Sequence, residues 1–349
     1  MKKYLLPNHG NFYKANLHSH SDVSDGKYSP EELKKMYMEQ GYSIIAYTDH
    51  EVFISHDELT DENFLALNGF ETGANEPNSD EKPGFDDVRV CHLCFIALDK
   101  NNKMHPVWHR NVSCWGNMAQ YKNQVQFDEN EPNFPRTYSP ENINEMMKRG
   151  REHGFFVTYN HPAWSLESYP DYMRYEGMNA MEIFNTASYN GGHEDYNPEV
   201  YDDLLRSGKR VYCVAADDNH GSPQDFFGGF VMIKAEQLEY NTITSALEKG
   251  NFYASRGPQI YDLWFEDGKV HITCSDARTI EIGTGGRRTQ SVWGENGNSV
   301  TEAEFKVMPG DRYIRLTVTD AEGNTANTNA YFTDELFDSL YEEEPAARS

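Results

Sequence analysis

NLHSHSDVSDG, residues 16–26, follows an aromatic and apolar run and carries two histidines and an aspartate close together. If the run FYKANLHSH is a β-strand, His18 and His20 leave the same face, because strand side chains alternate between faces. Two imidazoles on one face can bind one metal ion, and Asp25 follows on a tight Ser-Asp-Gly turn. A lone His-x-His pair is weak evidence, since paired histidines are common on surfaces and in cores. The stretch therefore indicates a metal site only if further ligands recur.

Ligand-type residues do recur at the ends of later β-like runs. After a helical segment that begins at Ser29 and ends at Gly41, the run SIIAYTDH closes with Asp49 and His50. Further runs supply Glu71 in FLALNGFETG, His92 in RVCHLCFIAL, His161 in FFVTYNHP, Glu182 and Asn185 in NAMEIFN, and Asp217, Asp218 and His220 in RVYCVAADDNHG. Each alone is more often structural, because such residues cap helices or accept backbone hydrogen bonds. Their recurrence predicts that these residues gather at one rim of a closed parallel sheet, which is where a β/α barrel has its catalytic residues.

Taken together, these motifs resemble those of the PHP (polymerase and histidinol phosphatase) family of metal-dependent phosphoesterases. The matching motifs, in the family's order, are NLHSHSDVSDG, YTDH, the glutamate of GFETG, the histidine of VCHLCFIAL, NHP and DDNH. They extend over roughly residues 12–256. The resemblance implies an α/β fold, a distorted seven-stranded (β/α) barrel of PHP type, with a trinuclear metal centre.

The resemblance also implies a set of nine metal ligands. Its first ion would be held by His18, His20, Glu71 and Asp218, its second by Glu71, His92 and His161, and its third by Asp25, His50 and His220. Asp25 stands where many relatives have a histidine, as in the branch whose motif reads Ser-Asp-Gly. Two to three divalent ions are therefore expected, and the mixed shell of imidazoles and carboxylates suits Zn, Mn or Fe.

Three neighbouring residues compete for these roles. Asp217 is out of phase with His220 on a strand, so Asp218 is the preferred ligand. Asp49 precedes a predicted ligand and is expected to orient it. Cys94 is in phase with His92 and could be a soft ligand, although a buried free thiol is the more common case.

Composition predicts a soluble, cytoplasmic protein. The chain has 349 residues, 38% of them hydrophobic, and no run reaches the about 18 apolar residues of a membrane span. Its beginning, MKKYLLPNHGNF, lacks the apolar core of a secretory signal. Five cysteines in a chain of this length fit reduced thiols better than a disulfide framework.

The charge balance limits the partners. The net charge is -25, from 56 acidic and 31 basic residues. Such a surface repels nucleic-acid polymers, which need clustered cations to neutralise their phosphates. A small anionic substrate is a different case, because divalent ions would make the rim locally positive. We therefore expect a phosphate ester as substrate, and neither a nucleic-acid polymer nor a membrane as partner.

Pattern changes along the chain predict its organisation. Residues 1–258 form the predicted barrel, interrupted at 100–138 by an aromatic insert that is expected to be a lid or pocket wall, or alternatively to pack against the barrel side. Short alternating runs at 259–335 predict a small antiparallel β-sandwich module, and 336–349 is an acidic tail. The junction ASRGP and the stretch TVTDAEGNTANTNAYF resemble the carbaryl-hydrolase-like branch of the family.

The predicted reaction is hydrolysis of a small phosphate ester by a metal-bridging hydroxide. Glu71 would bridge two ions, and Asp25 or His220 would help to hold the departing oxygen. Arg256 in the ASRGP turn is the candidate phosphate contact. Glu182 and Asn185 are expected to orient ligands or to bind substrate.

Two other functions fit the same residues. An amidohydrolase-like reaction would cleave an ester, carbamate or amide at the same metal centre. A non-catalytic carbohydrate- or partner-binding protein would use the β module and keep the barrel as a relic, although a relic has little reason to keep all nine ligands. The sequence selects neither the substrate nor the oligomeric state.

Overall fold

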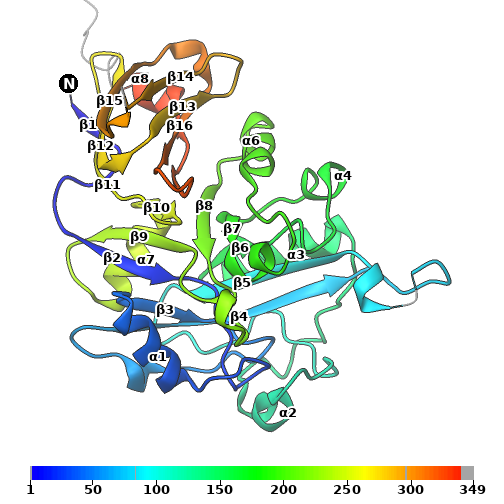
Figure 1. The fold of residues 1–349 in the computed structure, drawn as a ribbon. Coiled ribbons are helices and arrows are strands. Elements are labelled where there is room, and N and C mark those ends of the chain that lie inside the picture. The colour runs from blue at the N-terminus through cyan, green and yellow to red at the C-terminus, as the bar shows by residue number, and fades with distance from the viewer. Residues whose placement is uncertain (1, 83, 295–296, 339–349) are drawn as a thin grey trace, which may run out of the picture.

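The computed structural model describes residues 2–82, 84–294 and 297–338. Within these residues, one large mixed sheet and a smaller antiparallel sheet form an α/β fold (Figure 1). The strands are β1 (Lys3–Tyr4), β2 (Asn11–Asn16), β3 (Ile44–Tyr47), β4 (Leu65–Asn75), β5 (Val90–Ala97), β6 (Phe155–Tyr159), β7 (Ala180–Asn185), β8 (Tyr212–Ala216), β9 (Phe230–Ala235), β10 (Phe252–Ser255), β11 (Ile260–Glu266), β12 (Lys269–Ala277), β13 (Thr279–Thr284), β14 (Gln290–Trp293), β15 (Val300–Lys306), β16 (Tyr313–Thr319), β17 (Thr325–Thr328) and β18 (Tyr331–Phe332).

The helices lie between these strands, and the first of them begins at the predicted capping residue Ser29. They are α1 (Pro30–Glu39), α2 (Met118–Tyr121), α3 (Pro140–Glu152), α4 (Tyr169–Tyr172), α5 (Thr186–Asn190), α6 (Pro198–Arg206), α7 (Tyr240–Glu248) and α8 (Thr333–Asp338). At the start of α1, Ser29 accepts a hydrogen bond from the N–H of Glu32, and the Glu32 carboxylate accepts one from the N–H of Ser29. This capping box satisfies two backbone donors, and the helix predicted between Ser29 and Gly41 is confirmed.

The large sheet is mixed, which corrects the prediction of a parallel sheet. Its order is β14-β13-β16-β17-β10-β9-β2-β3-β4-β5-β6-β7-β8, with β18 paired to β16. The strands β2, β3 and β4 are parallel, as are β6, β7 and β8, but β5 is antiparallel to both β4 and β6. The chain reverses directly through residues 76–89, whereas a parallel return needs a long crossover, usually a helix.

The sheet curls until the continuations of β2 and β8 meet. Just beyond these strands, Ser19 and Asn219 form a parallel bridge, and the N–H of Asp218 donates to the carbonyl of His18 at 2.9 Å. β2 is also paired along its length with the antiparallel strand β9, so the sheet continues past β2 into β9 and β10. The seven-stranded barrel of PHP type therefore stays a prediction.

An apolar core inside the curled sheet holds the strand ends in place. It is built from strand residues and the buried face of α7, including Ala15, Ile44, Leu65, Leu67, Ile96, Phe156, Val214, Val231, Ile243 and Leu247. Because side chains from strands far apart in sequence interlock here, the loops that follow these strands start from fixed positions.

The C-terminal strands form two antiparallel layers around a second core. The order β1-β11-β12-β15 makes the smaller sheet, and β13, β14, β16 and β17 extend the large one through the pairing of β17 with β10. Apolar residues of both layers share one cluster, among them Leu5, Leu263, Ile272, Ile314 and Leu316. The predicted antiparallel module is present, its boundary at residue 258 stays a prediction, and residues 339–349 of the predicted tail lie outside the described residues.

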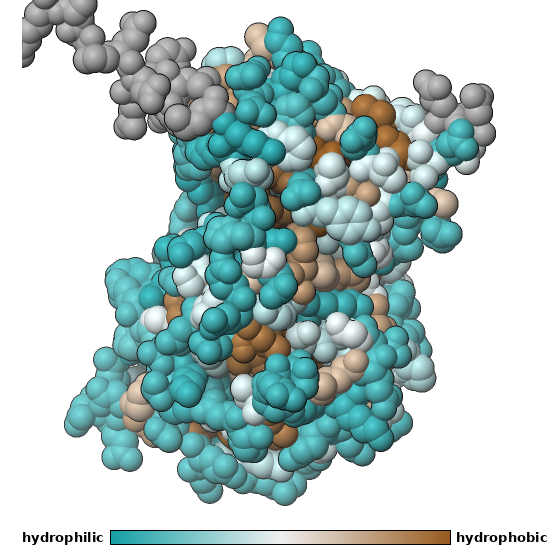
Figure 2. Space-filling model, turned by 90° about the vertical axis from the view of Figure 1, so that its left-hand side faces the viewer, coloured by the Kyte–Doolittle hydropathy of each residue, from teal (hydrophilic) through white to brown (hydrophobic). Residues whose placement is uncertain are grey.

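The face of the molecule drawn in Figure 2 is mainly hydrophilic. On this face, hydrophobic residues gather in small areas between hydrophilic ones. Among the described residues, every helix is too short or too polar to cross a bilayer.

Candidate metal centre

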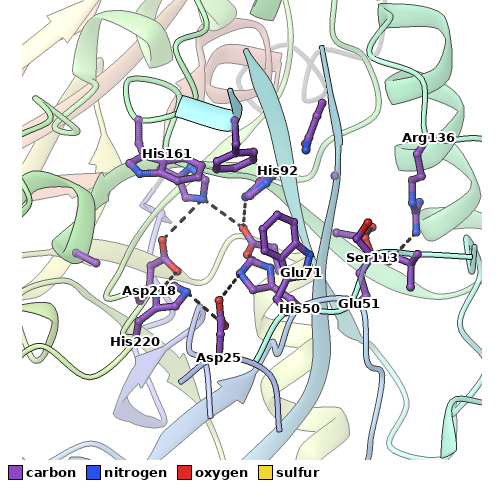
Figure 3. A pocket seen from close by; sticks show the side chains of 18 of the residues that line it. Asp25, His50, Glu51, Glu71, His92, Ser113, Arg136, His161, Asp218 and His220 are labelled. Carbon is purple, nitrogen blue, oxygen red and sulfur yellow. Dashed lines mark hydrogen bonds and ion pairs between the residues drawn. The ribbon is translucent and has the colours of Figure 1, made fainter. Parts of the chain in front are cut away.

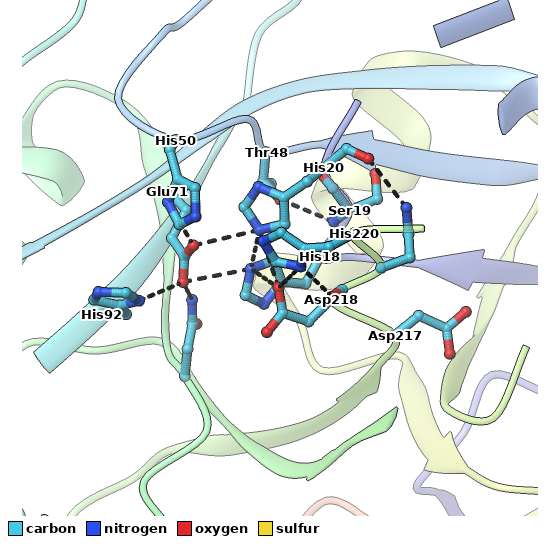
Figure 4. A network of polar contacts seen from close by, with 12 residues as sticks. His18, Ser19, His20, Thr48, His50, Glu71, His92, Asp217, Asp218 and His220 are labelled. Atoms are coloured by element: carbon cyan, nitrogen blue, oxygen red, sulfur yellow. Dashed lines mark hydrogen bonds and ion pairs between the residues drawn. The ribbon is translucent and has the colours of Figure 1, made fainter. Parts of the chain in front are cut away.

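All nine predicted metal ligands lie at one rim of the large sheet; Figure 3 labels seven of them, and Figure 4 labels His18 and His20. They come from the continuation of β2 (His18, His20, Asp25), from the residues after β3 (His50), β6 (His161) and β8 (Asp218, His220), and from within β4 (Glu71) and β5 (His92). Since β5 runs against β4, its beginning lies at this rim, and His92 pairs across the ladder with Gly73. His92, near the start of β5, therefore lies beside ligands from the ends of the neighbouring strands.

The first group is fully buried and consists of His18, His20, Glu71 and Asp218 (Figure 4). Asp218 Oδ1 lies 3.2 Å from His18 Nε2 and 3.0 Å from His20 Nε2. Glu71 approaches the same two rings with both oxygens, each at 3.4 Å from one Nε2. The four donor atoms therefore face a common point.

The second group shares Glu71 with the first. Glu71 Oε1 lies 3.3 Å from His92 Nδ1 and 3.2 Å from His161 Nε2. The Asn160 amide donates a hydrogen bond to the same oxygen at 2.8 Å and fixes the carboxylate. A carboxylate shared by two donor groups has the geometry expected of a bridging ligand.

The third group lies nearer to solvent. His50 Nε2 and His220 Nε2 each lie 3.6 Å from an oxygen of Asp25, and His20 Nδ1 lies 3.9 Å from it. The side chains of Asp25 and His220 are 29% and 37% exposed, in contrast to the buried ligands of the first group. The outer group is therefore the one that faces an incoming molecule.

Two unpartnered atoms test whether these residues fit metal ions. His20 Nδ1 and Asp218 Oδ1 are buried without a hydrogen-bond partner, although Asp218 Oδ1 lies close to two imidazoles. Nε2 of His18 and Nε2 of His20 also face one another at 3.1 Å. Buried polar atoms in proteins are nearly always satisfied, so Asp218 Oδ1 fits a cation in the first group and His20 Nδ1 fits one in the outer group. Imidazole and carboxylate donors in such groups fit divalent Zn, Mn or Fe.

The electrostatics of the cluster keep its carboxylates charged. Burial by itself would raise the pKa of Glu71, but the imidazoles of His18, His92 and His50 lower it well below its usual range. Asp218 shows the same balance, and its pKa is lowered by His18, His20 and other neighbours. Ionised carboxylates are the form that binds metal.

Buried hydrogen bonds orient the ligand rings. Nδ1 of His18 lies 2.7 Å from Glu182 Oε1, and the other oxygen of Glu182 accepts from the backbone N–H of His161 at 3.0 Å. Asn185 donates to Glu182 at 2.9 Å and to Asp218 at 3.1 Å. Glu182 and Asn185 thus stand behind the ligands and do not line the cavity, which agrees with orientation and leaves substrate contact unsupported.

The two competing aspartates have separate partners. Asp49 accepts hydrogen bonds from the backbone and hydroxyl groups of Ser21 and Ser24, and so fixes the loop that carries Asp25. Asp217 points away from the centre (Figure 4) and accepts from Thr186 and from the backbone N–H groups of residues 227–229. Asp218, with a φ of 54°, turns toward the ligands instead.

Cys94 behaves as the buried free thiol that is the preferred interpretation of its position, and not as a soft ligand. Cys94 is buried, and its sulfur accepts from Asn160 at 3.2 Å. Burial raises the pKa of its thiol to about 11, so it stays protonated at neutral pH. All five cysteines are free.

A cavity of about 690 Å³ opens over the metal centre. The predicted insert supplies a large part of its wall, namely His109, Asn111, Val112, Ser113, Trp115 and Arg136. Other residues of the insert, such as Trp108 and Phe134, are buried in apolar clusters. The insert therefore both lines the pocket and packs against the rest of the protein.

Arg256 lies elsewhere. Its guanidinium stacks on Phe184 and Tyr189, 4.1 and 4.7 Å from the ring centroids, and the residue does not line the cavity. The predicted contact with a substrate phosphate is therefore not supported by its position.

Sequence reasoning missed several residues of the site. Asn160 precedes His161 in the motif NHP, so its place beside a ligand was a usable signal. Phe85, Trp164 and Arg136 also reach the cavity, but they lie in irregular segments without periodicity that could have revealed this.

Comparisons with known proteins give matches among solved structures, whereas no protein-family model and no curated protein matches the chain. A two-domain protein of Bacteroides vulgatus, described as containing a predicted PHP-like metal-dependent phosphoesterase, is 15% identical, with a TM-score of 0.45 over 95% of this chain and 97% of that chain. A proposed metal-dependent phosphoesterase of Bifidobacterium adolescentis is 14% identical, with a TM-score of 0.38 over 63% and 91%. An amidohydrolase of Chromobacterium violaceum, with bound sulfate and no metal, is 15% identical, with a TM-score of 0.41 over 60% and 89%.

One of these solved structures is described as PHP-like, after the same family that the motifs of this chain resemble. TM-scores of 0.38 to 0.45 mark a partial likeness, which assigns no activity to this chain. The carbaryl-hydrolase-like branch stays a prediction.

Proposed function

We propose that this protein is a metal-dependent hydrolase that cleaves small phosphate esters at the centre around Glu71. The observation that supports this proposal most is the position of Glu71, a buried carboxylate shared by two groups of imidazoles. The motif order that resembles the PHP family points the same way. Divalent ions held there would act as Lewis acids and lower the pKa of a bound water.

The protein groups have distinct tasks in this proposal. Glu71 holds the two buried groups at a fixed separation, and Glu182 keeps the ring of His18 facing them. Asp25 and His220 line the cavity from the exposed side of the centre. With His50, these two residues would hold an ion in the outer group, and such an ion would stabilise the negative charge that develops on the leaving oxygen.

The test uses the full-length protein stripped with a chelator and reloaded with Zn²⁺ or Mn²⁺. Its turnover is measured on phosphomonoesters, phosphodiesters and aryl carboxylate esters, with metal content determined in parallel. We expect phosphoester turnover that falls at least about 100-fold on stripping and returns on reloading. His161→Ala should lose metal and activity, whereas His9→Ala, a change in an exposed histidine outside the cavity, should lose neither. Inert phosphate esters on metal-loaded protein would contradict the proposal.

A second candidate is cleavage of an ester, carbamate or amide at the same centre. One observation favours it: Arg136, the lone arginine or lysine among the described residues that line the cavity, is already paired with Glu51 at 2.8 Å. A phosphate therefore depends on the metal ions for its neutralisation. Turnover of aryl carboxylate esters with every phosphate ester inert would select this second reaction.

The remaining expectations stay predictions. They are a cytoplasmic location, a small anionic substrate in preference to a nucleic-acid polymer, and catalysis in preference to carbohydrate or partner binding. The nine ligands brought together at one rim favour catalysis over a binding role.

A further inference from the structure

Three aromatic side chains from separate segments line the cavity above the metal centre. Phe85 comes from the connection between β4 and β5, Trp115 from the insert, and Trp164 from the segment after β6. Phe85 and Trp115 are 37% and 41% exposed, whereas large apolar residues of this chain are mostly buried. Core packing does not explain exposed aromatic rings that converge on one cavity, so they point to a ligand.

These rings form a continuous wall beside the proposed ligands. The ring centroid of Phe85 lies 5.7 Å from that of Trp115 and 6.1 Å from that of Trp164. Trp115 lies 6.3 Å from the ring of His50, and Trp164 lies 5.4 Å from that of His92. A group attached to an atom at the metal centre would therefore rest against this aromatic wall, defined by Phe85, Trp115 and Trp164.

Trp115 is held in place although it is exposed. A Cβ on the next residue, Gly116, would lie 2.1 Å from the carbonyl oxygen of Ser24 and 2.7 Å from the Cα of Asp25, so the two loops touch closely. The backbone N–H of Asn117 donates to the same carbonyl at 2.7 Å. The indole is thus presented by a loop that is fixed to the turn carrying Asp25, and such preorganisation favours binding.

Away from the metal centre, the described residues that line the cavity offer no free positive charge that could bind a second anionic group of a substrate. Arg136 and Glu51 lie together on the far side of Glu71 from Asp218 (Figure 3), and their charges compensate each other. On the opposite side, Asp25 and Asp218 are assigned to the metal ions, and no lysine or arginine lies among the described lining residues there. A substrate with an anionic group away from the metal ions would meet a paired cation or a carboxylate.

We infer that the aromatic wall is a specificity subsite for a flat, uncharged group, so that the substrates are monoesters of aryl alcohols or similarly flat alcohols with a single anionic group. This inference rests on the proposed function, since it places that anionic group at the metal centre. Stacking on two indoles and a phenyl ring supplies the affinity for the flat group. The specificity-determining residues are Trp115 and Trp164.

The test measures binding separately from turnover. Isothermal titration of the metal-loaded protein compares phenylphosphonate with methylphosphonate, neither of which is an ester. We expect phenylphosphonate to bind at least about tenfold more tightly, and Trp115→Ala or Trp164→Ala to remove about three- to tenfold of that preference with the affinity for methylphosphonate unchanged. Trp115→Phe should restore most of it. Trp293→Ala, a change in an exposed indole on β14 outside the cavity, is the matched control and should leave the preference intact.

Any of the following results would overturn the inference. Equal affinities for the two phosphonates, or equal losses for both in the tryptophan variants, would overturn it. Binding of 4-phosphonobenzoate tighter than that of phenylphosphonate would also overturn it, because its carboxylate requires a free cation. Failure of the proposed function gives a different result: phenyl phosphate and ethyl phosphate both stay uncleaved by the metal-loaded protein, whatever the phosphonates do.

Discussion

Two buried glutamates in this protein have opposite electrostatic surroundings. Glu71 in β4 and Glu167 after β6 are 1% and 8% exposed. Imidazoles surround Glu71, and they lower its pKa well below the usual range against the effect of burial. Phenol groups of Tyr138, Tyr159 and Tyr175 donate to Glu167, yet burial raises its pKa to about 7.

This difference shows which neighbouring groups keep a buried carboxylate charged. Neutral hydroxyl donors stabilise the charged form of Glu167 too weakly to offset its burial. Imidazoles can carry charge or bind a cation, so the charge of Glu71 is retained in a site as deeply buried. Burial alone therefore does not mark a functional glutamate, whereas the chemistry of its neighbours does.

The largest effect is expected from the region of Glu71. Glu71→Gln keeps the shape of the side chain but removes the charge shared by two ligand groups, so activity should fall at least about 1000-fold. Metal content measured by mass spectrometry should fall as well. Glu167→Gln is the matched control, since it makes the same change in an equally buried position, and it should keep both. Equal metal contents in the two variants would show that the two regions do not differ as described.

The second prediction tests whether the outer group binds its ion independently of the buried ligands. Asp25→Asn should lower activity about 100-fold and metal content by one ion, because Asp25 belongs to the outer group only. The ions around Glu71 should remain, as measured by metal analysis after gel filtration. Loss of all metal from this variant would mean that the outer and inner groups form one inseparable site.

A smaller effect is expected from Glu182, which lies behind the first group of ligands. Glu182→Gln weakens the hydrogen bond to His18 Nδ1, and such changes typically reduce metal affinity about 10- to 100-fold. Competition with a chromogenic chelator measures this affinity, and Glu199→Gln, a change on α6, serves as control. An unchanged affinity would leave Glu182 with a structural role only.

The smallest effect on activity, and a distinct effect on stability, is expected from Glu167. Between its ordinary pKa of 4.5 and about 7, the unfolded chain loses the proton while the folded protein keeps it, so stability falls as pH rises through this window. The loss amounts to about 3 kcal/mol. Glu167→Gln cannot titrate and should remove this part of the pH dependence, as measured by urea unfolding at pH 5 and pH 7.5. The same slope in both proteins would place the titration elsewhere.

The proposed metal ligands could be predicted from sequence because each belongs to a short local pattern. His18 and His20 follow one strand at alternate positions, and Asp218 and His220 repeat that spacing after another. The structure ends β2 at Asn16, so His18 and His20 lie just beyond the strand and not on it as the run FYKANLHSH predicted. The full set of nine came from the resemblance to the PHP family, because local patterns alone left each residue open to a structural role.

The other features of the site depend on the course of the loops, which local sequence patterns do not encode. The strand that carries His92 was predicted, but its direction depends on how residues 76–89 return. Arg256 looked like a rim residue, yet the turn after β10 sends it onto the rings of Phe184 and Tyr189. The convergence of Phe85, Trp115 and Trp164 arises from three irregular segments. Contacts of this kind come from tertiary structure alone.

The pairing of β10 with β17 has a consequence for how the two parts of this molecule can be separated. A fragment cut at residue 258 would leave β10 as an open edge, and Leu5 and Leu6 would lose the apolar partners that bury them. Exposed edges and uncovered apolar side chains promote self-association. The C-terminal strands thus cover an edge and apolar side chains of the part that carries the candidate metal centre, so a chimera would have to include both parts together.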